Sequence, residues 1–460
     1  MLPFVAHYVV YPFHERLLGR ATFPYSRDLE ESQWGSPDEL RKLQRCKLRD
    51  LLTHARAKIP FYRRRLDEAG VDPATCDPFE ALSSLPLLDK TEIRAGVDDM
   101  VWQDAPGGLF AYDTGGSTGE PLTFYFDRRR QGYDQAARIR THRWFGVEVG
   151  DRELYLWGSP IETSRTDALK HLRDRLSNQL LLNAFDMSVR QMDRYLDKLE
   201  SFRPVCIFGY PSSISLLAEH AQSQGRRLNL PNLRAVFVTG EVCYPHHRDI
   251  IDSVFSVPVA DGYGSREVGF IAHQCPQGSF HLTAENVIVE IVDSDQPVPH
   301  GETGEIVVTH LDAYAMPFIR YRTGDVGRLK AGRCSCGRGL PLVDVIQGRT
   351  TEFLYLPDGK IMHALSIIYP LRRLRGVRRF RVTQHEDYAV TVDVVCDDGA
   401  EKITREAVAK SVRPVLGSEV DLRVQMVDRL DTVESGKHRY VVSHAKPATP
   451  AAFQEACAGV

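Results

Sequence analysis

Segments with helical and with strand-like apolar spacing alternate along the middle of the chain. Helical spacing occurs over residues 131–144, 168–182, 189–202 and 211–223. Four short apolar runs are typical of buried strands, at residues 153–157, 205–208, 234–239 and 257–260. Strands that alternate with helices of this length indicate a parallel sheet with crossover helices. The sequence therefore predicts an α/β core.

The pattern changes on either side of this core. Leucines at helical spacing predict amphipathic helix over residues 37–66. After residue 279, period-two runs at 286–292 and 304–309 are separated by Gly, Pro and Asp, which predicts an antiparallel β region. The last part of the chain has segments typical of strand, strand, helix and strand, at 380–384, 388–395, 404–415 and 420–427. We expect a compact α+β module there.

These changes divide the chain into two predicted domains. The first is a large N-terminal α/β body over residues 1–347, and the second is a small α+β domain over residues 348–460. We place the boundary at residues 348–352. Within the body we expect a helical extension, an α/β core and a β region, over residues 1–100, 101–280 and 281–347.

Charge and cysteine content exclude several classes of protein. The 58 Lys and Arg nearly balance the 61 Asp and Glu, for a net charge of -3, so we expect no nucleic-acid partner. Nine cysteines at irregular intervals are unlike a secreted disulfide framework, which favours the reducing cytoplasm. No run approaches the roughly 18 uncharged apolar residues that predict a membrane span. Both a monomer and a homodimer fit these features.

Residues 2–13 are apolar and aromatic. No basic segment precedes them, no small-residue cleavage site follows them, and Glu15 and Arg16 come next, so they are unlike a signal peptide. We expect a terminal helix docked on the body. An interfacial membrane anchor is the alternative.

A segment rich in Gly and hydroxyl residues lies between two strand-like runs, at residues 113–121. Gly lets backbone N–H groups turn toward an anion, and hydroxyls add donors without bulk, so such a loop can hold phosphate. The Gly-Lys-Ser/Thr ending of a Walker A loop is missing, and a strand follows instead of a helix. A glycine-rich hairpin with no ligand is the alternative.

Further motifs follow the predicted strands. Residues 239–241 (Thr-Gly-Glu) end one strand, and residues 261–269 (Asp-Gly-Tyr-Gly-Ser-Arg-Glu-Val-Gly) follow the next as a predicted loop. Both should open at the carboxyl edge of the sheet, where open α/β sheets bind ligands. Residues 320–325 come after a β segment, residues 348–349 lie at the domain boundary, and residues 435–437 (Ser-Gly-Lys) lie near the end of the last module.

In this order, the motifs resemble those of the adenylate-forming enzymes. The resemblance is closest to the phenylacetate–CoA ligase-like branch, which includes members found with capsular polysaccharide genes, and it covers residues 36–443. It implies an ATP cleft completed by the β region and a mobile C-terminal lid. It also implies activation of a small carboxylic acid by ATP to an acyl adenylate, with release of pyrophosphate. Coenzyme A thiol is the first choice of acyl acceptor; an amine, giving an amide, and a non-catalytic ATP-binding scaffold are the alternatives.

The resemblance assigns roles position by position. It implies that the ATP phosphates are bound by the loop formed by Thr114, Gly115, Gly116, Ser117, Thr118 and Gly119. It implies that the rest of the nucleotide is bound by Gly240, Glu241, Asp261, Gly262, Tyr263, Gly264, Ser265, Arg266, Asp325 and Arg349. Tyr263 would stack on adenine, Asp325 would accept hydrogen bonds from the ribose hydroxyls, and Arg349 would bind from the hinge side. Ordinary turn chemistry and ion pairing explain these residues as well.

Two charged residues carry the chemistry implied by the resemblance. Glu267 would hold Mg²⁺, which prefers hard oxygen ligands, and Lys437 would offset the negative charge that builds as a carboxylate attacks phosphorus. Solvated side chains are the alternative for both. The sequence departs from the family pattern at Arg266, where many relatives have Thr or Ser, and this exchanges a hydroxyl for a forked phosphate donor. Glu120 and Glu352 replace a common Lys and a common Asp.

An acyl pocket is expected where several predicted strands end at the same edge. Its candidates are Trp157, Gly158, Ser159, Tyr210, Pro211, Ser212 and the turn at 239–241. The two aromatic rings would suit an aryl acid. Ordinary aromatic packing explains them equally well.

Cysteine and histidine form a second cluster in the sequence. Cys275 and His281 lie in one β segment, and Cys334 and Cys336 lie in a Gly turn. Three thiolates and one imidazole are typical of a closed structural zinc site, and similar positions occur in the ligase branch. His273 could replace His281 as the imidazole ligand, and buried free thiols are the alternative to zinc.

The run at 371–381 contains six arginines, including Arg372 and Arg381. Such a run is usually a solvated face. Contact with the phosphates of coenzyme A or with another anionic partner is the alternative.

Overall fold

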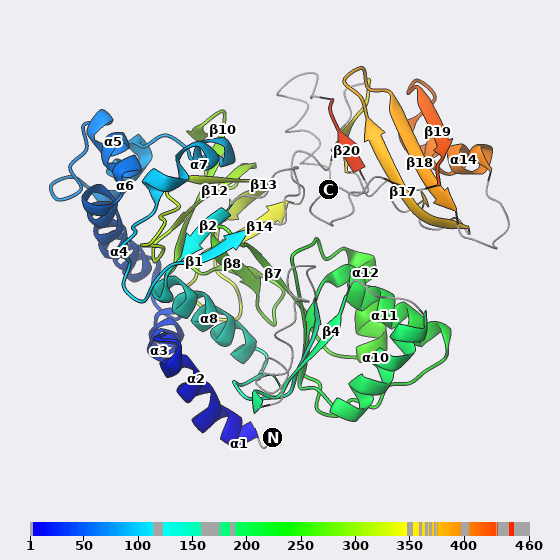
Figure 1. Cartoon of the computed structure of the whole chain (residues 1–460), viewed down its shortest axis with the longest axis horizontal. Helices are drawn as coiled ribbons and strands as arrows, with labels where there is room; N and C mark the ends of the chain where they lie inside the picture. The colour runs from blue at the N-terminus through cyan, green and yellow to red at the C-terminus, as the bar shows by residue number, and fades with distance from the viewer. Residues whose placement is uncertain are drawn as a thin grey trace.

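The computed structural model describes most of the N-terminal body and part of the C-terminal domain. The described residues of the body are 3–113, 123–157, 174, 176–184 and 189–346. Those of the C-terminal part are 353–357, 361–363, 367, 370–371, 374, 376–396, 404–428, 430 and 441–445. Figure 1 shows a large body built on one sheet, with helices along its outer edge, and a smaller group of strands and one helix beside it.

A twelve-stranded mixed sheet organises the body, in the order β11-β10-β12-β13-β14-β9-β8-β7-β6-β5-β3-β4. One half is parallel and contains β3 (Glu153–Trp157), β4 (Gln179–Asn183), β5 (Cys206–Gly209), β6 (Ala235–Thr239) and β7 (Val259–Ser265). The helices that accompany these strands are α10 (Val189–Phe202), α11 (Pro211–Ser223) and α12 (Pro245–Phe255). Apolar side chains of these helices and strands share one buried cluster. The predicted α/β class is confirmed.

One predicted helix is wrong at its C-terminal end. The segment 168–182 was expected to be helical, but Gln179–Asn183 forms strand β4 at the edge of the sheet. Leu180 and Leu182 pair in parallel with Leu154 and Leu156 of β3. A run of three leucines fits a helix and a buried strand equally well by periodicity, so the pairing partner decides the conformation.

The other half of the sheet is antiparallel. It contains β8 (Gly269–Gln274), β9 (Phe280–Leu282), β10 (Val287–Asp293), β11 (Gln296–Pro297), β12 (Gly304–His310), β13 (Tyr321–Lys330) and β14 (Leu342–Ile346). Strand β7 joins the halves, because it pairs in parallel with β6 and antiparallel with β8. The β region is therefore a continuation of the core sheet.

The N-terminal segment of the body is helical, and its helices over residues 37–100 cover the antiparallel half of the sheet. The helices of the whole segment are α1 (Pro3–Val5), the π-helix η1 (Ala6–Val10), α2 (Tyr11–Leu17), α3 (Thr22–Ser32), α4 (Pro37–Lys58), α5 (Pro60–Glu68), α6 (Pro78–Ser84), α7 (Lys90–Gly96) and the 3₁₀ helix η2 (Val97–Met100). Ser36 and Glu39 form a capping box that starts α4. No helix of the described residues is long and apolar enough to cross a membrane.

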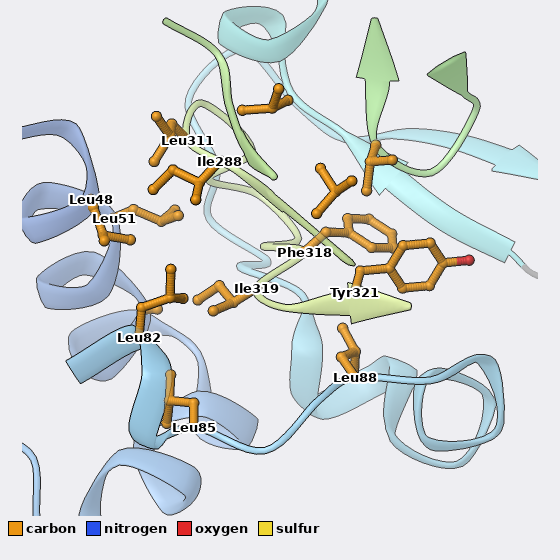
Figure 2. Close-up of a cluster of buried hydrophobic side chains, with 14 of the residues drawn as sticks. Leu48, Leu51, Leu82, Leu85, Leu88, Ile288, Leu311, Phe318, Ile319 and Tyr321 are labelled. Atoms are coloured by element: carbon orange, nitrogen blue, oxygen red, sulfur yellow. The ribbon is translucent and has the colours of Figure 1, made fainter. Parts of the chain in front are cut away.

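The packing between these helices and the sheet determines where the later site residues lie. Figure 2 shows Leu48 and Leu51 of α4 and Leu82 of α6 facing apolar side chains of the β region. Leu88 extends this contact, because its backbone N–H donates to the carbonyl of Arg320 and its own carbonyl accepts from Arg322. The segment before α7 is therefore fixed against β13.

A hairpin and a long helix complete the described body. Strands β1 (Phe110–Asp113) and β2 (Thr123–Phe126) pair as an antiparallel hairpin, with Asp113 opposite Thr123 as the last pair. Helix α8 (Arg128–Arg143) follows and packs on α3 and β8. Its N-terminus is capped by Asp127, whose side chain accepts from the backbone N–H of Arg130.

The C-terminal part contains a four-stranded sheet in the order β19-β18-β17-β20. Its elements are β17 (Val377–Gln384), β18 (Val390–Cys396), α14 (Arg405–Leu416), β19 (Leu422–Met426) and β20 (Val441–Ser443). A separate pair, β15 (Phe353–Tyr355) and β16 (Ile361–His363), precedes it. Apolar residues of β17, β18 and α14 share a core of their own. The end of the arginine-rich run lies in β17, while Arg372, Arg373 and Arg375 lie outside the described residues.

Candidate functional site

The ends of three parallel strands bring three predicted pocket residues together. Trp157 ends β3, Tyr210 follows β5, and Gly240 follows β6. The rings of Trp157 and Tyr210 stack with centroids 4.0 Å apart and planes 15° from parallel. Gly240 has a φ of +80°, and a Cβ there would lie 3.2 Å from the Tyr210 ring, so the turn requires glycine. The result is a flat aromatic wall beside a glycine turn.

The residues that flank this wall also meet. Pro211 opens α11 with Tyr210 as the preceding cap residue. The backbone N–H of Ser212 donates to Oε2 of Glu241 at 3.3 Å. Glu241 thereby connects the turn after β6 with the N-terminus of α11, where a negative charge is favoured by the helix dipole.

The segment 261–265, predicted as a loop, is part of strand β7. Asp261 pairs with Val238 and Gly262 with Thr239 of β6, and on the other side Tyr263 pairs with Ala272 of β8. A Cβ on Gly264 would lie 2.5 Å from the carbonyl oxygen of Gly269. The glycines therefore permit close strand approach, and partners on both sides keep the segment extended.

Asp261 carries a perturbed carboxyl group inside this ladder. Burial raises the pKa of Asp261 from its ordinary 3.8 to about 7, and the Arg248 guanidinium offsets only part of that rise. Arg248 is held by Oε1 of Gln274 at 2.8 Å. The same Gln274 oxygen accepts from the backbone N–H of Asp261 at 3.1 Å.

Two motifs that are distant in sequence meet at the pair Tyr263 and Asp325. The Tyr263 hydroxyl donates to Oδ2 of Asp325 at 2.9 Å. The backbone N–H of Asp325 donates a hydrogen bond to the Thr323 hydroxyl oxygen at 3.1 Å. Residues 321–325 belong to strand β13 (Tyr321–Lys330), which has a positive φ at Gly324.

Glu267 lies in a buried ion pair. Its carboxylate is 5% exposed, accepts from the Tyr321 hydroxyl at 3.2 Å, and lies 3.3 Å from the Nζ of Lys90. Both contacts are made by Oε1. A simple solvated role for this residue is therefore excluded. Arg130, which is almost fully buried, donates to the carbonyl of the neighbouring Arg266 at 2.9 Å and so holds the same turn.

Lys90 is a site residue that the sequence reasoning missed. It is the first residue of α7, directly after Asp89, which forms a capping box with Glu92. The pattern Asp-x-x-Glu predicts that a helix starts there, so the cap was available as a signal. The contact with Glu267 depends on the pairing of Leu88 with Tyr321, which no local spacing reveals.

The predicted cysteine and histidine cluster is assembled. Ligand atoms of Cys275, His281, Cys334 and Cys336 all lie within 4.8 Å of one another. Cys275 Sγ is 3.6 Å from Cys334 Sγ, and Cys336 Sγ is 3.3 Å from His281 Nε2. A tetrahedral ion with Zn–S bonds of about 2.3 Å places its ligands roughly 3.8 Å apart. These two distances are close to that edge length, so the four groups are near enough together to bind one ion.

The members of the cluster titrate differently, since burial raises the pKa of the Cys275 thiol to about 11, away from the thiolate form that binds metal. Burial lowers the pKa of His281 to about 4, which leaves a neutral imidazole, and its Nδ1 faces the carbonyl of Leu340 at 3.4 Å. For Cys334, burial alone would raise the thiol pKa. Hydrogen bonds with Ser279 and with the backbone and side chain of Cys336 outweigh burial and lower it to about 7. Fixing one ring nitrogen while the other faces the ligand set is usual for histidines that bind metal.

His273, the alternative imidazole, lies outside the cluster. Its Nδ1 donates to the carbonyl of Gln274 at 2.8 Å, and its ring stacks on Phe270. Its ring also lies near those of Phe145 and Phe237. His281 is therefore the histidine of this site.

Several predicted residues lie outside the part of the chain that the structure describes. They are Thr114, Gly115, Gly116, Ser117, Thr118, Gly119, Gly158, Ser159, Arg349 and Lys437. Their neighbours Asp113 and Thr123 end the β1–β2 hairpin, so the phosphate-loop candidate connects two paired strands. Lys437 lies between β19 and β20 in the chain.

Comparisons with known proteins agree with this arrangement. The family of AMP-binding enzymes matches residues 180–312, and the CapK C-terminal domain matches residues 354–444. A phenylacetate–coenzyme A ligase of Thermus thermophilus is 28% identical over 69% of this chain and 72% of its own. The chain belongs to the adenylate-forming enzymes, in the branch of the phenylacetate–CoA ligases and CapK.

Other relatives of this adenylate-forming enzyme extend the match over almost the whole chain. A phenylacetate–coenzyme A ligase of Pseudomonas putida is 24% identical over 88% of this chain and 94% of its own. Protein CapK of Staphylococcus aureus is 22% identical over 89% of this chain and 90% of its own. A crystal structure of 2-hydroxyisobutyryl-CoA ligase has a TM-score of 0.68 at 20% identity, with 90% of this chain and 91% of that chain covered. This adenylate-forming enzyme thus shares its fold with that ligase over 90% of its length.

Proposed function

We propose that this enzyme activates a small carboxylic acid with ATP and transfers the acyl group to the thiol of coenzyme A. A carboxylate oxygen would attack the α-phosphorus of ATP, and the bond to pyrophosphate would break. The thiol sulfur would then attack the acyl carbonyl, lose its proton, and displace AMP. The observation that carries the proposal is that one sheet bears the aromatic wall, the Tyr263–Asp325 pair and Glu267.

The nucleotide would lie along the ends of β6 and β7. Gly240, Glu241 and residues 261–266 would line the adenine, and the contact between Tyr263 and Asp325 supports a shared role for the two. The tyrosine hydroxyl orients one carboxylate oxygen of Asp325. An oriented aspartate can accept hydrogen bonds from both hydroxyls of a ribose diol.

The phosphates would lie between Glu267 and the loop Thr114–Gly119. Glu267 would hold Mg²⁺, since it is a buried carboxylate next to the nucleotide motif. The ion would neutralise phosphate oxygens as pyrophosphate departs. Lys90 supplies positive charge to Glu267 in this structure, so Lys90 and a bound cation would compete for the same oxygen.

Lys437 and Arg349 complete the proposed machinery. Lys437 would meet the carboxylate and the α-phosphate when the C-terminal domain closes on the body. A lysine aimed at developing charge stabilises the transition state more than the bound substrate. A scaffold that only binds ATP does not need such a residue, and this favours an enzyme over that alternative.

The acid would bind beside the stacked pair Trp157 and Tyr210. Each ring covers one face of the other, so the pair offers a flat apolar wall on which a planar or short acyl chain can lie. Ser159, Pro211 and Ser212 would complete the pocket. The curated ligases named above act on phenylacetate, and the aromatic wall supports an aryl acid here.

We also propose a structural zinc ion bound by Cys275, His281, Cys334 and Cys336. The four ligand atoms lie close enough together for a tetrahedral site, and four protein ligands leave no open position for substrate. The ion would tie the turn after β8 to the connection between β13 and β14.

All eight cysteines among the described residues are free thiols, which supports a reducing, cytoplasmic location.

The decisive experiment is a panel of carboxylic acids incubated with MgATP. We expect acid-dependent release of pyrophosphate, and with coenzyme A present, an acyl-CoA product identified by mass spectrometry. An acyl adenylate that forms but transfers only to an added amine would identify an amide ligase. Binding of ATP without acid-dependent pyrophosphate release for any acid would identify a scaffold.

A further inference from the structure

Apolar side chains are exposed along one face of the first helical segment. Ten large apolar side chains are exposed among the described residues, and half of them belong to residues 4–17. They are Phe4 (69% exposed), Tyr8 (63%), Val9 (59%), Phe13 (62%) and Leu17 (69%). We name these five residues the N-terminal apolar face. The segment runs along the edge of the body (Figure 1).

A π-helical turn aligns these residues. The segment consists of α1, η1 and α2, and η1 spans the five residues Ala6–Val10. A turn of π-helix takes more residues than the 3.6 of an α-helix. The spacing Phe4, Tyr8, Phe13, Leu17 of four, five and four residues therefore keeps all four on one side.

The opposite side of the segment is docked on the body by small and polar groups. Ala6 is fully buried, and Nδ1 of His7 donates to the carbonyl of Val149 at 2.8 Å. Nε2 of Gln179, in β4, donates to the Tyr11 hydroxyl at 2.8 Å. Glu15 is buried and paired with Arg20 and Thr22. These contacts fix the rotation of the segment, so the apolar face cannot turn inward.

This is the reverse of an ordinary surface helix, which buries its apolar stripe and exposes its polar one. The apolar face thus needs an external partner. Exposed apolar patches with a polar margin mark sites of protein or membrane association.

The charge around the apolar face selects between these partners. Glu15 is the only acidic residue among residues 3–27, and it is buried. Arg16 is exposed and lies three residues from Phe13, which makes the two neighbours on the helix surface. At the other end of the face, Glu148 and Asp151 line the hollow beside Phe4 and Tyr8, and Arg143 pairs with Glu148. Among the described residues, the unpaired positive charge of the face therefore lies at Arg16, and this end of the aromatic and aliphatic face complements an anionic lipid surface.

We propose that the N-terminal apolar face lies in the interface of a lipid bilayer that contains anionic lipids. The 15 residues of the segment span about 22 Å, at 1.5 Å per residue, which is short of the roughly 30 Å of a bilayer core. The segment therefore lies in the plane of the membrane. Phe4, Phe13 and Leu17 enter the headgroup boundary, and Arg16 remains at the phosphates.

Cosedimentation of the full chain with vesicles tests this proposal. We expect binding to vesicles of phosphatidylcholine with 30% phosphatidylglycerol, and much weaker binding to phosphatidylcholine alone. The triple variant Phe4→Ser, Tyr8→Ser, Phe13→Ser should lower the partition coefficient by about 10-fold or more, because three large apolar groups no longer leave water. Arg16→Glu should weaken binding at 0.1 M salt and have less effect at 0.5 M salt.

Leu216→Ser is the matched control, since Leu216 is an exposed leucine (40%) on α11, outside the segment. It should bind vesicles like the parent chain. The triple variant leaves the docking contacts of Ala6, His7, Tyr11 and Glu15 intact, so its melting temperature should be unchanged. If the triple variant melts at a lower temperature, the single variant Phe13→Ser replaces it in the vesicle-binding test. Equal binding by all variants, or no binding of the parent chain to anionic vesicles, would overturn the proposal. A lipid-independent dimer that the triple variant abolishes would identify a second copy as the partner and overturn it as well.

Discussion

The ammonium group of Lys90 lies 3.3 Å from the carboxylate of Glu267, although the two residues belong to segments far apart in the sequence. The Leu88–Tyr321 bridge and the apolar cluster drawn in Figure 2 bring them together. Tyr321 contributes twice, through this backbone pairing and through its hydroxyl on Glu267. The N-terminal helices therefore supply a charge to the proposed magnesium site.

We predict that Lys90→Met destabilises the protein through Glu267. Glu267 is almost completely buried, and Lys90 is only about a quarter exposed, so the variant leaves a buried carboxylate with less compensation. The expected loss of unfolding free energy is about 1 kcal/mol, between the values for exposed and buried pairs. On a Glu267→Gln background the same substitution should cost much less, because no charge remains to be compensated.

Chemical denaturation of the two single variants and the double variant measures this coupling. Lys330→Met is the matched control, since Lys330 pairs with Asp344 at 3.8 Å on an exposed surface. It should have no measurable effect. Additive effects of the Lys90 and Glu267 changes would mean that the ion pair contributes nothing to stability.

We predict that Glu267→Gln raises the magnesium concentration needed for pyrophosphate release. The substitution keeps the size and removes the charge that a hard cation requires. A magnesium titration of acid-dependent turnover should show a shift of about 10-fold or more, while Glu302→Gln, an exposed carboxylate elsewhere, should leave it unchanged. An unchanged titration for Glu267→Gln would assign this residue to a purely structural ion pair.

The fold class and most element positions could be predicted from apolar spacing. Helix 189–202 and strand 153–157 match the structure at both ends. The prediction failed where several conformations share one local pattern. Strand β4 was assigned to a helix because three consecutive leucines carry no period, and the strand-forming residues 261–265 were assigned to a loop because their glycines are also turn formers. In both cases the pairing with a neighbouring strand determines the conformation of the segment.

The site could be predicted only as far as its motifs are local. Tyr263 and Asp325 were each expected at the nucleotide from a motif, but their mutual hydrogen bond joins β7 and β13, which are not adjacent in the sheet and which no local pattern relates. Lys90 was missed for the same reason. His281 and His273 could not be distinguished by spacing, because they pair directly on adjacent strands, and only the folded structure shows that His281 alone lies among the three thiols.

We predict that Lys437→Ala lowers turnover far more than it affects ATP binding. If Lys437 acts on charge that develops in the transition state, the loss should be about 10²-fold or more in kcat, with little change in ATP affinity. Lys410→Ala, an exposed lysine on α14 of the same domain, is the control. Normal acid-dependent pyrophosphate release by Lys437→Ala would remove Lys437 from the mechanism.

We predict that Asp261 makes stability depend on pH near neutrality. Its pKa rises from 3.8 in the unfolded chain to about 7 in the folded protein because of burial. The folded state therefore binds the proton more tightly, so the contribution of Asp261 is fully present below pH 3.8 and is lost as the pH rises toward 7. Between pH 5 and pH 8 the parent chain should lose on the order of 2 kcal/mol relative to Asp261→Asn, which cannot ionise.

Urea denaturation of both proteins at pH 5, 6, 7 and 8 measures this difference. Subtracting one curve from the other cancels the titration of all other groups. A constant difference across this range would show that Asp261 titrates with an ordinary pKa. A difference that grows in favour of the parent chain at high pH would reverse the sign and contradict the assigned burial effect.

We predict that the protein carries about one zinc ion per chain and that Cys336→Ser removes it. Cys336 lies 3.3 Å from His281 and would supply one of the four proposed ligands, and a serine hydroxyl is a poor substitute for a thiolate. Because zinc binds the folded state, its loss should lower the melting temperature; a ligand at 1,000 times its dissociation constant contributes about 4 kcal/mol. Cys46→Ser, an exposed cysteine outside the cluster, should keep both zinc and stability. Metal analysis of protein purified without chelator tests this prediction. Absence of zinc from that protein would contradict it and would mean that three free thiols and one imidazole pack together without a metal. A metal whose binding changed with substrate would instead mean that the site has an open position and takes part in the reaction.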